Sequence, residues 1–325
     1  MVGVSVAVCT YNRAESLRDT LESLVAQQTN GFTYEIIVVD NNSHDHTKTV
    51  AQQFNGKVKY VFEPRQGVSY ARNKGIQEAK GQVIAFTDDD VIVDPNWIAS
   101  LYKCFKETKA LAVAGKIERL WNCKRPGWLS DEIMAPLIVQ DLGSARKKWD
   151  QKNHHMVAAN MAFHRSAFEK YGLFREELGR RGNSLIGGED REIFKRLFED
   201  GASIFYEPRA IVAHKVERER LSKEYMRRWF WEVGKTLGHE IEFKWHNFFT
   251  IGPFWLWEDL AFACARYLKV SLKPDSTDSE KFAAEIWCSH YGAMLMERFV
   301  HWLPFGLGKK WCVFKQEVSK NQKLK

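Results

Sequence analysis

The chain has 325 residues, a formal net charge of +7, and hydrophobic and charged fractions of 45% and 27%. These values are ordinary for a globular protein large enough to bury a substantial core. No stretch of about 18 uninterrupted apolar residues occurs, so we expect no membrane-spanning helix. The mild positive charge suits an anionic substrate, an anionic membrane face or nucleic acid, and does not choose among them.

The cysteines are scattered and form neither a CxxC pair nor a histidine-partnered spacing, which argues against a zinc site. They are Cys9, Cys104, Cys123, Cys264, Cys288 and Cys312. Cysteines without a disulfide framework suit a reducing cytosol. The first residues run straight into an apolar strand with no basic segment before it, so we expect no secretion signal.

The first part of the chain alternates apolar strands with amphipathic helices. We predict strands at 4–9, 35–39, 57–62 and 82–86, and helices at 15–28, 45–54 and 69–79. This order favours an α/β fold with a mostly parallel sheet and right-handed crossovers. Ligands of such sheets bind at the carboxyl ends of the strands.

Polar clusters follow each of these predicted strands. They occupy residues 10–13, 40–43, 63–67 and 88–90. A single cluster is explained by a turn, but four on one sheet edge indicate a binding site. Neither a GxGxxG nor a GxxxxGK[ST] sequence is present, which argues against a dinucleotide fingerprint or a Walker phosphate loop.

The acidic run Asp88-Asp89-Asp90 follows the apolar strand at 82–86 and contains no basic residue. Three adjacent carboxylates repel one another, and a fold tolerates them where a cation binds. Hard cations such as Mg²⁺ and Mn²⁺ take oxygen ligands. The alternative interpretation is a solvated acidic turn.

A second group of acids follows two glycines in the middle of the chain. Glu189 and Asp190 open a predicted helix with an apolar face at residues 193, 194, 197 and 198. Acids in a first helical turn are stabilised by the helix dipole, which is the simpler explanation for them. We predict a further strand pair at 203–206 and 210–213, which ends at His214.

From about residue 215 the composition changes, and eight of the twelve tryptophans lie in this part. Arginine and lysine are interleaved with them, as in MRRWFW at 226–231. The pattern predicts amphipathic helices, which could lie on a membrane surface, pack as a cap or oligomer contact, or stack on nucleic acid. The basic end, residues 309–325, is expected to fray.

Taken together, these segments resemble the family 2 glycosyltransferases over residues 4–238. The resemblance rests on VSVAVCTYNR at 4–13, VVDNNS at 38–43, GVSYARNKG at 67–75, FTDDD at 86–90, ANMAF at 159–163, GED at 188–190 and His214. It implies the GT-A fold, a Rossmann-like, mostly parallel sheet flanked by helices, in a domain of residues 1–215. Its nucleotide-binding half would span about 1–118 and its acceptor half about 119–215, before a helical, aromatic-rich region at 216–325.

The resemblance also implies an enzyme, an inverting hexosyltransferase that uses a nucleotide diphosphosugar donor, with UDP as the usual carrier. The expected acceptor is a glycan, glycolipid or lipid-linked hydroxyl in polysaccharide or cell-envelope synthesis. The expected location is the cytoplasm or, as a peripheral protein, the cytosolic membrane face, with no nucleic-acid partner. Nucleotide-binding roles fall on Thr10, Tyr11, Arg13, Asp40, Arg72 and Asp88.

Five further residues take chemical roles by the same resemblance. Asp90 and His214 would hold a divalent metal, Mn or Mg, which neutralises charge on the leaving diphosphate. Asp190 would be the general base that deprotonates the acceptor hydroxyl. Asn160 and Glu189 would lie near the donor or acceptor sugar.

One motif departs from the processive members of this family. The QxxRW motif of those members appears here as Tyr225-Met226-Arg227-Arg228-Trp229. We therefore expect one sugar to be added per encounter. Two alternative functions remain. One is a sugar-1-phosphate nucleotidyltransferase, which the sequence favours less because the glycine-rich loop of those enzymes is missing. The other is a non-catalytic nucleotide-sugar sensor or scaffold on the same fold.

Overall fold

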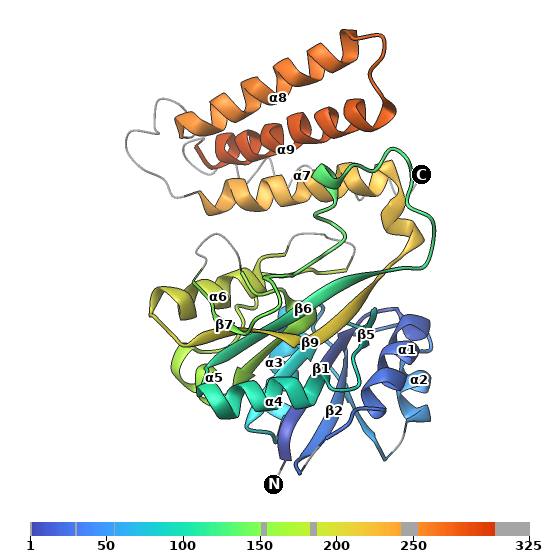
Figure 1. Ribbon diagram of the computed structural model, residues 1–325, viewed down its shortest axis with the longest axis vertical. Helices are drawn as coiled ribbons and strands as arrows, with labels where there is room; N and C mark the ends of the chain where they lie inside the picture. The colour runs from blue at the N-terminus through green and yellow to red at the C-terminus, as the bar shows by residue number, and fades with distance from the viewer. Residues whose placement is uncertain are drawn as a thin grey trace. The chain divides into compact units, whose positions relative to one another are not determined.

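The structure is a computed structural model that describes residues 2–29, 31–54, 56–150, 155–182, 187–241 and 253–302. The chain forms two compact units (Figure 1). The first unit comprises Met1–Cys123 and Leu137–Glu217, and the second comprises Lys124–Pro136 and Arg218–Lys325. Residues 124–136 therefore group with the second unit.

The first unit is built on one twisted sheet with the strand order β3-β2-β1-β4-β8-β6-β9-β5, and β7 pairs with β9. The strands are β1 (Val2–Thr10), β2 (Thr33–Asp40), β3 (Val58–Phe62), β4 (Val83–Thr87), β5 (Val91–Val93), β6 (Ala112–Trp121), β7 (Lys147–Lys148), β8 (Met161–His164) and β9 (Ile204–Val216). Strands β1 to β4 are parallel, as predicted. Strand β8 runs antiparallel between β4 and β6, so the sheet is mixed in its second half.

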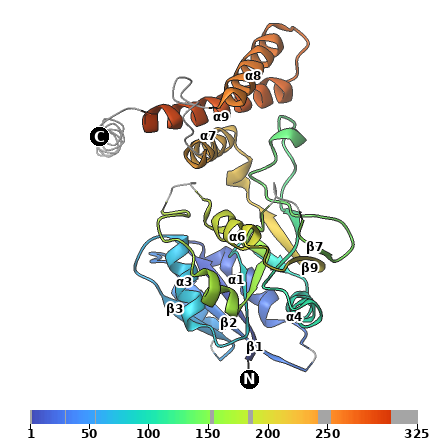
Figure 2. The same ribbon diagram turned by 90° about the vertical axis from the view of Figure 1, so that its left-hand side faces the viewer.

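Helices cover both faces of this sheet (Figures 1 and 2). They are α1 (Ala14–Val25), α2 (Thr47–Gln53), α3 (Val68–Glu78), α4 (Trp97–Thr108), α5 (Arg165–Tyr171) and α6 (Glu189–Glu199). Successive residues of a strand face opposite sides of the sheet. Thus Val4, Val6 and Val8 of β1 pack with α1, α2 and α4, while Ala7 packs with α3, α5 and α6. Burial on both faces explains why β1 is almost wholly apolar.

The predicted strand pair at 203–206 and 210–213 is wrong, because β9 is one continuous strand. Both of its halves pair in parallel with β6, and the register shifts where Gly115 faces Glu207 and Lys116 faces Ile211. This irregularity lets β9 pass Pro208 without a reversal. The strand consequently carries His214 to the edge where β4 ends.

Helix α6 begins after Gly188, whose φ of +104° lies in the left-handed region. Glycine adopts this conformation without the strain that a Cβ would impose. Ile193, Phe194 and Leu197 are buried in the core, which confirms the predicted apolar face. The helix therefore begins with Glu189 and Asp190 in its first turn.

The second unit contains the helices α7 (Lys223–Glu240), α8 (Phe254–Leu272) and α9 (Asp278–Trp302), and α9 packs against both of the others (Figures 1 and 2). Short 3-10 turns occur at Asp131–Ile133 and Arg218–Leu221 here, and at Ala158–Asn160 in the first unit. None of the described helices is long and apolar enough to cross a membrane. Trp245, Trp311 and the basic end at 309–325 lie outside the described residues.

Candidate functional site

The polar segments that follow β1, β2 and β3 meet at the carboxyl edge of the sheet, as predicted. The backbone N–H of Asn12 donates to Ser43 Oγ at 2.9 Å. Asn41 Nδ2 donates to the carbonyl oxygen of Arg65 at 2.7 Å, and the N–H of Gly67 donates to Asn41 Oδ1 at 2.7 Å. These hydrogen bonds connect the three loops to one another. Each side chain pairs with a backbone N–H or C=O group that has no partner in a strand or helix.

Asp40 is held at this rim by two donors. Its Oδ2 accepts from Tyr60 Oη at 2.7 Å, and its Oδ1 accepts from the N–H of Ser43 at 2.9 Å. Burial and the neighbouring Asp40 carboxylate raise the pKa of Tyr60 well above its ordinary value, so Tyr60 remains a donor. Thr10 pairs with Asp40 in the strand register and is buried, whereas Tyr11 is half-buried. The sequence did not indicate this role for Tyr60, because an aromatic residue in a predicted strand is normally interpreted as part of the hydrophobic core.

The three acids of the run Asp88-Asp89-Asp90, here called the acid triplet, differ in solvent exposure. The side chain of Asp88 is 34% exposed, whereas those of Asp89 and Asp90 are almost fully buried. Arg13 Nη1 donates to Asp89 Oδ1 at 3.2 Å and to Asp90 Oδ2 at 3.0 Å, and its Nη2 forms an ion pair with Glu217. The structure thus engages Arg13 with three carboxylates, and its predicted contact with the base and ribose stays a prediction. Glu217 was not foreseen, because no motif marks it.

Burial dominates the titration of the middle acid. It raises the pKa of Asp89 to about 7, with the negative charge of Asp90 acting in the same direction and Arg13 opposing both. A buried carboxyl beside another acid resists ionisation unless positive charge compensates it. Asp89 therefore ionises less readily than an exposed aspartate.

Asp88, Asp90 and His214 form a candidate metal centre. One ligand atom from each lies within 4.8 Å of the others. His214 Nε2 is 3.3 Å from Asp90 Oδ1 and 3.9 Å from Asp88 Oδ2. His214 Nδ1 faces the carbonyl oxygen of Lys215 at 3.2 Å, while the buried Nε2 has no hydrogen-bond partner among the described residues.

This donor set fits a divalent cation. If Nδ1 carries the proton and donates to the Lys215 carbonyl, Nε2 presents a lone pair toward the two carboxylates. Two carboxylates and one imidazole suit Mn²⁺ and also accept Mg²⁺. The sequence predicted Asp90 and His214 as ligands, and the structure adds Asp88, which the sequence had assigned to the ribose.

The second group of acids is organised by a buried ion pair between α3 and α6. Arg72 Nη1 bonds Glu189 Oε1, and both side chains are more than nine-tenths buried. The next residue, Asp190, accepts from the N–H of Ala158 at 3.2 Å and from that of Arg191 at 2.8 Å. Its carboxylate is therefore fixed at the start of α6.

Opposing charges act on Asp190. Burial and the Glu189 carboxylate raise its pKa, while His155 and Arg72 lower it, and the net direction is upward. Burial disfavours the charge of Arg72, but Glu189, Asp88 and Asp190 together raise the pKa of this guanidinium. The two acid groups are also linked by hydrogen bonds, because the N–H of Ala158 donates to Asp190 and Thr87 Oγ, next to Asp88, donates to the carbonyl oxygen of Ala159.

Asn160 does not present its side chain to this site. The residue has no exposed surface, and its Oδ1 accepts from Trp97 Nε1 at 2.8 Å. Its Nδ2 donates to the carbonyl oxygens of Lys116 and Ala210, each at 2.8 Å. The carboxamide therefore joins α4, β6 and β9, in place of the sugar contact that the sequence suggested.

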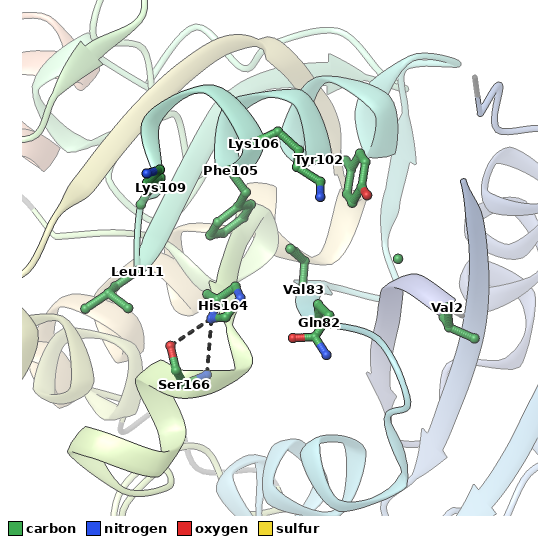
Figure 3. A pocket seen from close by; sticks show the side chains of 12 residues that line it. Val2, Gln82, Val83, Tyr102, Phe105, Lys106, Lys109, Leu111, His164 and Ser166 are labelled. Atoms are coloured by element: carbon green, nitrogen blue, oxygen red, sulfur yellow. Dashed lines mark hydrogen bonds between the residues drawn. The ribbon is translucent and has the colours of Figure 1, made fainter. Parts of the chain in front are cut away.

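A separate cavity of about 630 Å³ lies at the opposite edge of the sheet, where β1 and β4 begin (Figure 3). Tyr102, Phe105 and Lys106 of α4 line one side, and His164 and Ser166 line the other. His164 Nδ1 and Ser166 Oγ are 2.7 Å apart and bond each other. The described residues that line this cavity include none of the candidate site residues.

Comparisons with known proteins agree on the fold and the family. A model of the family described as "Glycosyl transferase family 2" matches residues 5–172. The chain is 29% identical over 240 residues to a glucosyl-dolichyl phosphate glucuronosyltransferase of Haloferax volcanii, covering 70% of this chain and 74% of that protein. It is 28% identical over 251 residues to the succinoglycan biosynthesis protein ExoM of Rhizobium meliloti, covering 75% and 77%.

Two solved structures are similar in fold. The crystal structure of GalNAc-T7 with UDP, GalNAc and Mn²⁺ aligns with a TM-score of 0.54 and 19% identity, covering 91% of this chain. The chain spans only 56% of that solved chain. The structure of Staphylococcus aureus TarS 1–349 aligns with a TM-score of 0.51 and 15% identity, covering 92% and 91%. The expected GT-A fold is confirmed.

Proposed function

Since the chain belongs to glycosyl transferase family 2, we propose that it is an inverting, metal-dependent enzyme that transfers a sugar from a nucleotide diphosphosugar. The proposed carrier is UDP, and the proposed acceptor is a hydroxyl of a glycan, glycolipid or lipid-linked saccharide. The coarser activity, sugar transfer in glycan or polysaccharide synthesis, follows from family membership and from the glycosyltransferase relatives.

One observation carries the proposal. The short turn at Ala158–Asn160 joins the two acid groups: the N–H of Ala158 donates to Asp190 at 3.2 Å, and Thr87, the residue before Asp88, donates to the carbonyl oxygen of Ala159 at 2.8 Å. A bound divalent ion would stabilise the negative charge that develops on a leaving diphosphate. Asp88, Asp90 and His214 would hold it, and the buried Arg72, paired with Glu189, adds a fixed positive charge to the second acid group.

Asp190 is the proposed general base. It sits on a segment separate from the acid triplet, which suits attack from the ring face opposite the leaving group. Its raised pKa makes the carboxylate a better proton acceptor than an exposed aspartate. The two backbone N–H donors hold the carboxylate in place before the acceptor arrives.

The donor is tested by thermal shift and diphosphate release across a panel of nucleotide sugars, each with and without Mn²⁺. We expect one donor to stabilise the protein only with metal and to be hydrolysed slowly. Asp190→Asn should reduce turnover by about 10² or more while donor binding persists. Equal losses of turnover and donor affinity in this variant would count against the assignment of the base.

The metal site is tested by Asp90→Asn, which keeps the size of the side chain but removes its charge. We expect this variant to lose metal-dependent donor binding, as measured by calorimetric titration with Mn²⁺ present. Asp94→Asn is a matched control, because Asp94 lies just beyond β5 and outside the candidate metal centre. Unchanged titrations in Asp90→Asn would overturn the ligand assignment.

We also propose that the second unit contacts the cytosolic face of a membrane through α8. Phe254, Phe262 and Leu272 lie on one face of this helix and are 71%, 74% and 81% exposed. Large apolar side chains at such exposure suit an interfacial helix that inserts one face below the lipid headgroups. A lipid-linked acceptor is consistent with this location, and the name of the Haloferax relative specifies a dolichyl phosphate substrate.

The membrane proposal is tested by cosedimentation with vesicles of phosphatidylglycerol and phosphatidylcholine. The double variant Phe262→Ser/Leu272→Ser should weaken binding about tenfold or more, because each side chain loses its apolar burial in lipid. Phe62→Ser is the matched control, since Phe62 is 47% exposed on β3 of the first unit. Retained binding in the double variant would place the membrane contact elsewhere.

A further inference from the structure

Arg13 links the acid triplet to the residue that follows β9. Its Nη1 reaches Asp89 Oδ1 at 3.2 Å and Asp90 Oδ2 at 3.0 Å, and its Nη2 pairs with Glu217. Both nitrogens of the fork are therefore engaged by carboxylates, although 28% of the side chain is exposed. A guanidinium in this position is a built-in counter-cation for the triplet.

The two oxygens of Asp90 face different directions. Oδ2 receives the hydrogen bond from Arg13, whereas Oδ1 lies 3.3 Å from His214 Nε2, within the candidate metal centre. A divalent ion bound there would share one carboxylate with Arg13. Two cations drawing on the same buried carboxylate repel each other, and partial burial strengthens that repulsion relative to water.

We propose that Arg13 sets the metal affinity of the site. It compensates the charge of Asp89 and Asp90 while no metal is bound, and it weakens metal binding by opposing the second cation. This inference rests on the proposed metal site and assigns to Arg13 a positioning and charge-balancing role, in place of a contact with the nucleotide. Glu217 moderates the effect, because it draws part of the positive charge of Arg13 away from the triplet.

The consequence concerns the order of binding. Arg13 keeps the affinity of the site for a metal ion moderate. The metal is retained firmly only when the diphosphate of the donor adds negative charge and further oxygen ligands. Because coupling between ligands is reciprocal, the diphosphate should bind more tightly in the presence of metal by the same factor. Removing Arg13 should reduce this interdependence, since the metal alone would then bind well.

The test is calorimetric titration of the full chain with MnCl₂, with and without UDP as the probe. Arg13→Gln should bind Mn²⁺ alone about tenfold more tightly than the native protein, as expected for the loss of a partly screened cation a few ångströms away. Arg13→Lys keeps the charge and should stay near the native affinity. Arg18→Gln changes a partly exposed arginine of α1, the helix that begins directly after Arg13, and should leave Mn²⁺ affinity unchanged.

Thermal stability gives an independent readout. In EDTA, Arg13→Gln should unfold at a lower temperature than Arg18→Gln, because the triplet has lost its counter-cation. Added Mn²⁺ should raise its melting temperature by more than that of the native protein, since a tighter ligand stabilises more strongly at equal concentration. If Arg13→Gln does not fold, Glu217→Gln must instead weaken Mn²⁺ binding, because Arg13 would then act on the triplet alone.

The outcomes separate this inference from the proposed function. Native protein that binds Mn²⁺, with equal or weaker binding in Arg13→Gln, overturns the role given to Arg13 and leaves the metal centre intact. Absence of Mn²⁺ binding in every variant, with UDP present, overturns the metal centre itself and the inference with it. Tighter binding in Arg13→Gln but not in Arg13→Lys supports the inference.

Discussion

The buried ion pair between Arg72 and Glu189 should support both folding and the chemistry of Asp190. The two side chains are only 6% and 8% exposed, and the guanidinium carbon of Arg72 lies 5.6 Å from the ring centroid of Phe174. Removal of one partner leaves the other charge buried without compensation. For such pairs the free energy of unfolding falls by about 3–5 kcal/mol.

Arg72→Met and Glu189→Gln are the two single variants, and their combination completes a double-mutant cycle. We expect each single change to cost about 3 kcal/mol or more, and the double variant to cost less than their sum, because it leaves no isolated charge. Urea unfolding monitored by tryptophan fluorescence measures these free energies. Lys195→Met, a change to an exposed cation on α6, is the matched control and should have little effect.

The same variants should move the pKa of Asp190 in opposite directions. Glu189 raises this pKa and Arg72 lowers it, so Glu189→Gln should shift the acid limb of the kcat/KM profile to lower pH and Arg72→Met to higher pH. Diphosphate release from the donor, followed across pH, provides the profile. Shifts of the same sign, or additive stability losses, would refute the coupling of the pair to Asp190.

Three further predictions concern the rest of the molecule. The pKa of Asp190 is raised in the folded protein, so the folded protein loses stability as pH rises through that pKa and the carboxyl ionises. Asp190→Asn cannot ionise. It should therefore have a higher melting temperature than the native protein at pH 8 and no advantage at pH 3. Gly115→Ala places a Cβ against a backbone carbonyl and a buried amide and should cost about 2–3 kcal/mol in urea unfolding, whereas Gly127→Ala meets nothing and should be neutral. Cys264 and Cys288 have sulfurs 3.1 Å apart on adjacent helices, so glutathione disulfide should oxidise them to a disulfide, seen by mass spectrometry as the loss of two hydrogens and of both alkylation sites.

Local patterns predicted the first half of the fold well. The period of apolar residues placed β1 to β4 and α1 to α3 within a few residues of their observed bounds. These elements follow from short-range chemistry, because a strand buried on both faces must be apolar throughout and a helix must repeat its apolar residues every three or four positions. The edge where polar loops gather followed from the same order of elements.

Longer-range features escaped the sequence because they depend on partners distant along the chain. Nothing near residue 208 indicates that β9 continues through Pro208, since only its pairing with β6 keeps both halves in one strand. Asn160 was expected near a sugar, but its buried amide is used by Trp97, Lys116 and Ala210. A polar side chain in a motif can serve either role, and burial decides between them.

The sequence by itself determined the family, the α/β order of the first unit and the identity of the acids, because motif residues and apolar periods are written locally. Only the tertiary structure decided how these acids are compensated. It set Arg13 between the triplet and Glu217, buried Arg72 against Glu189, and brought His214 to within 3.3 Å of Asp90. Charge balance is a property of distances between remote residues, and no local pattern records those distances.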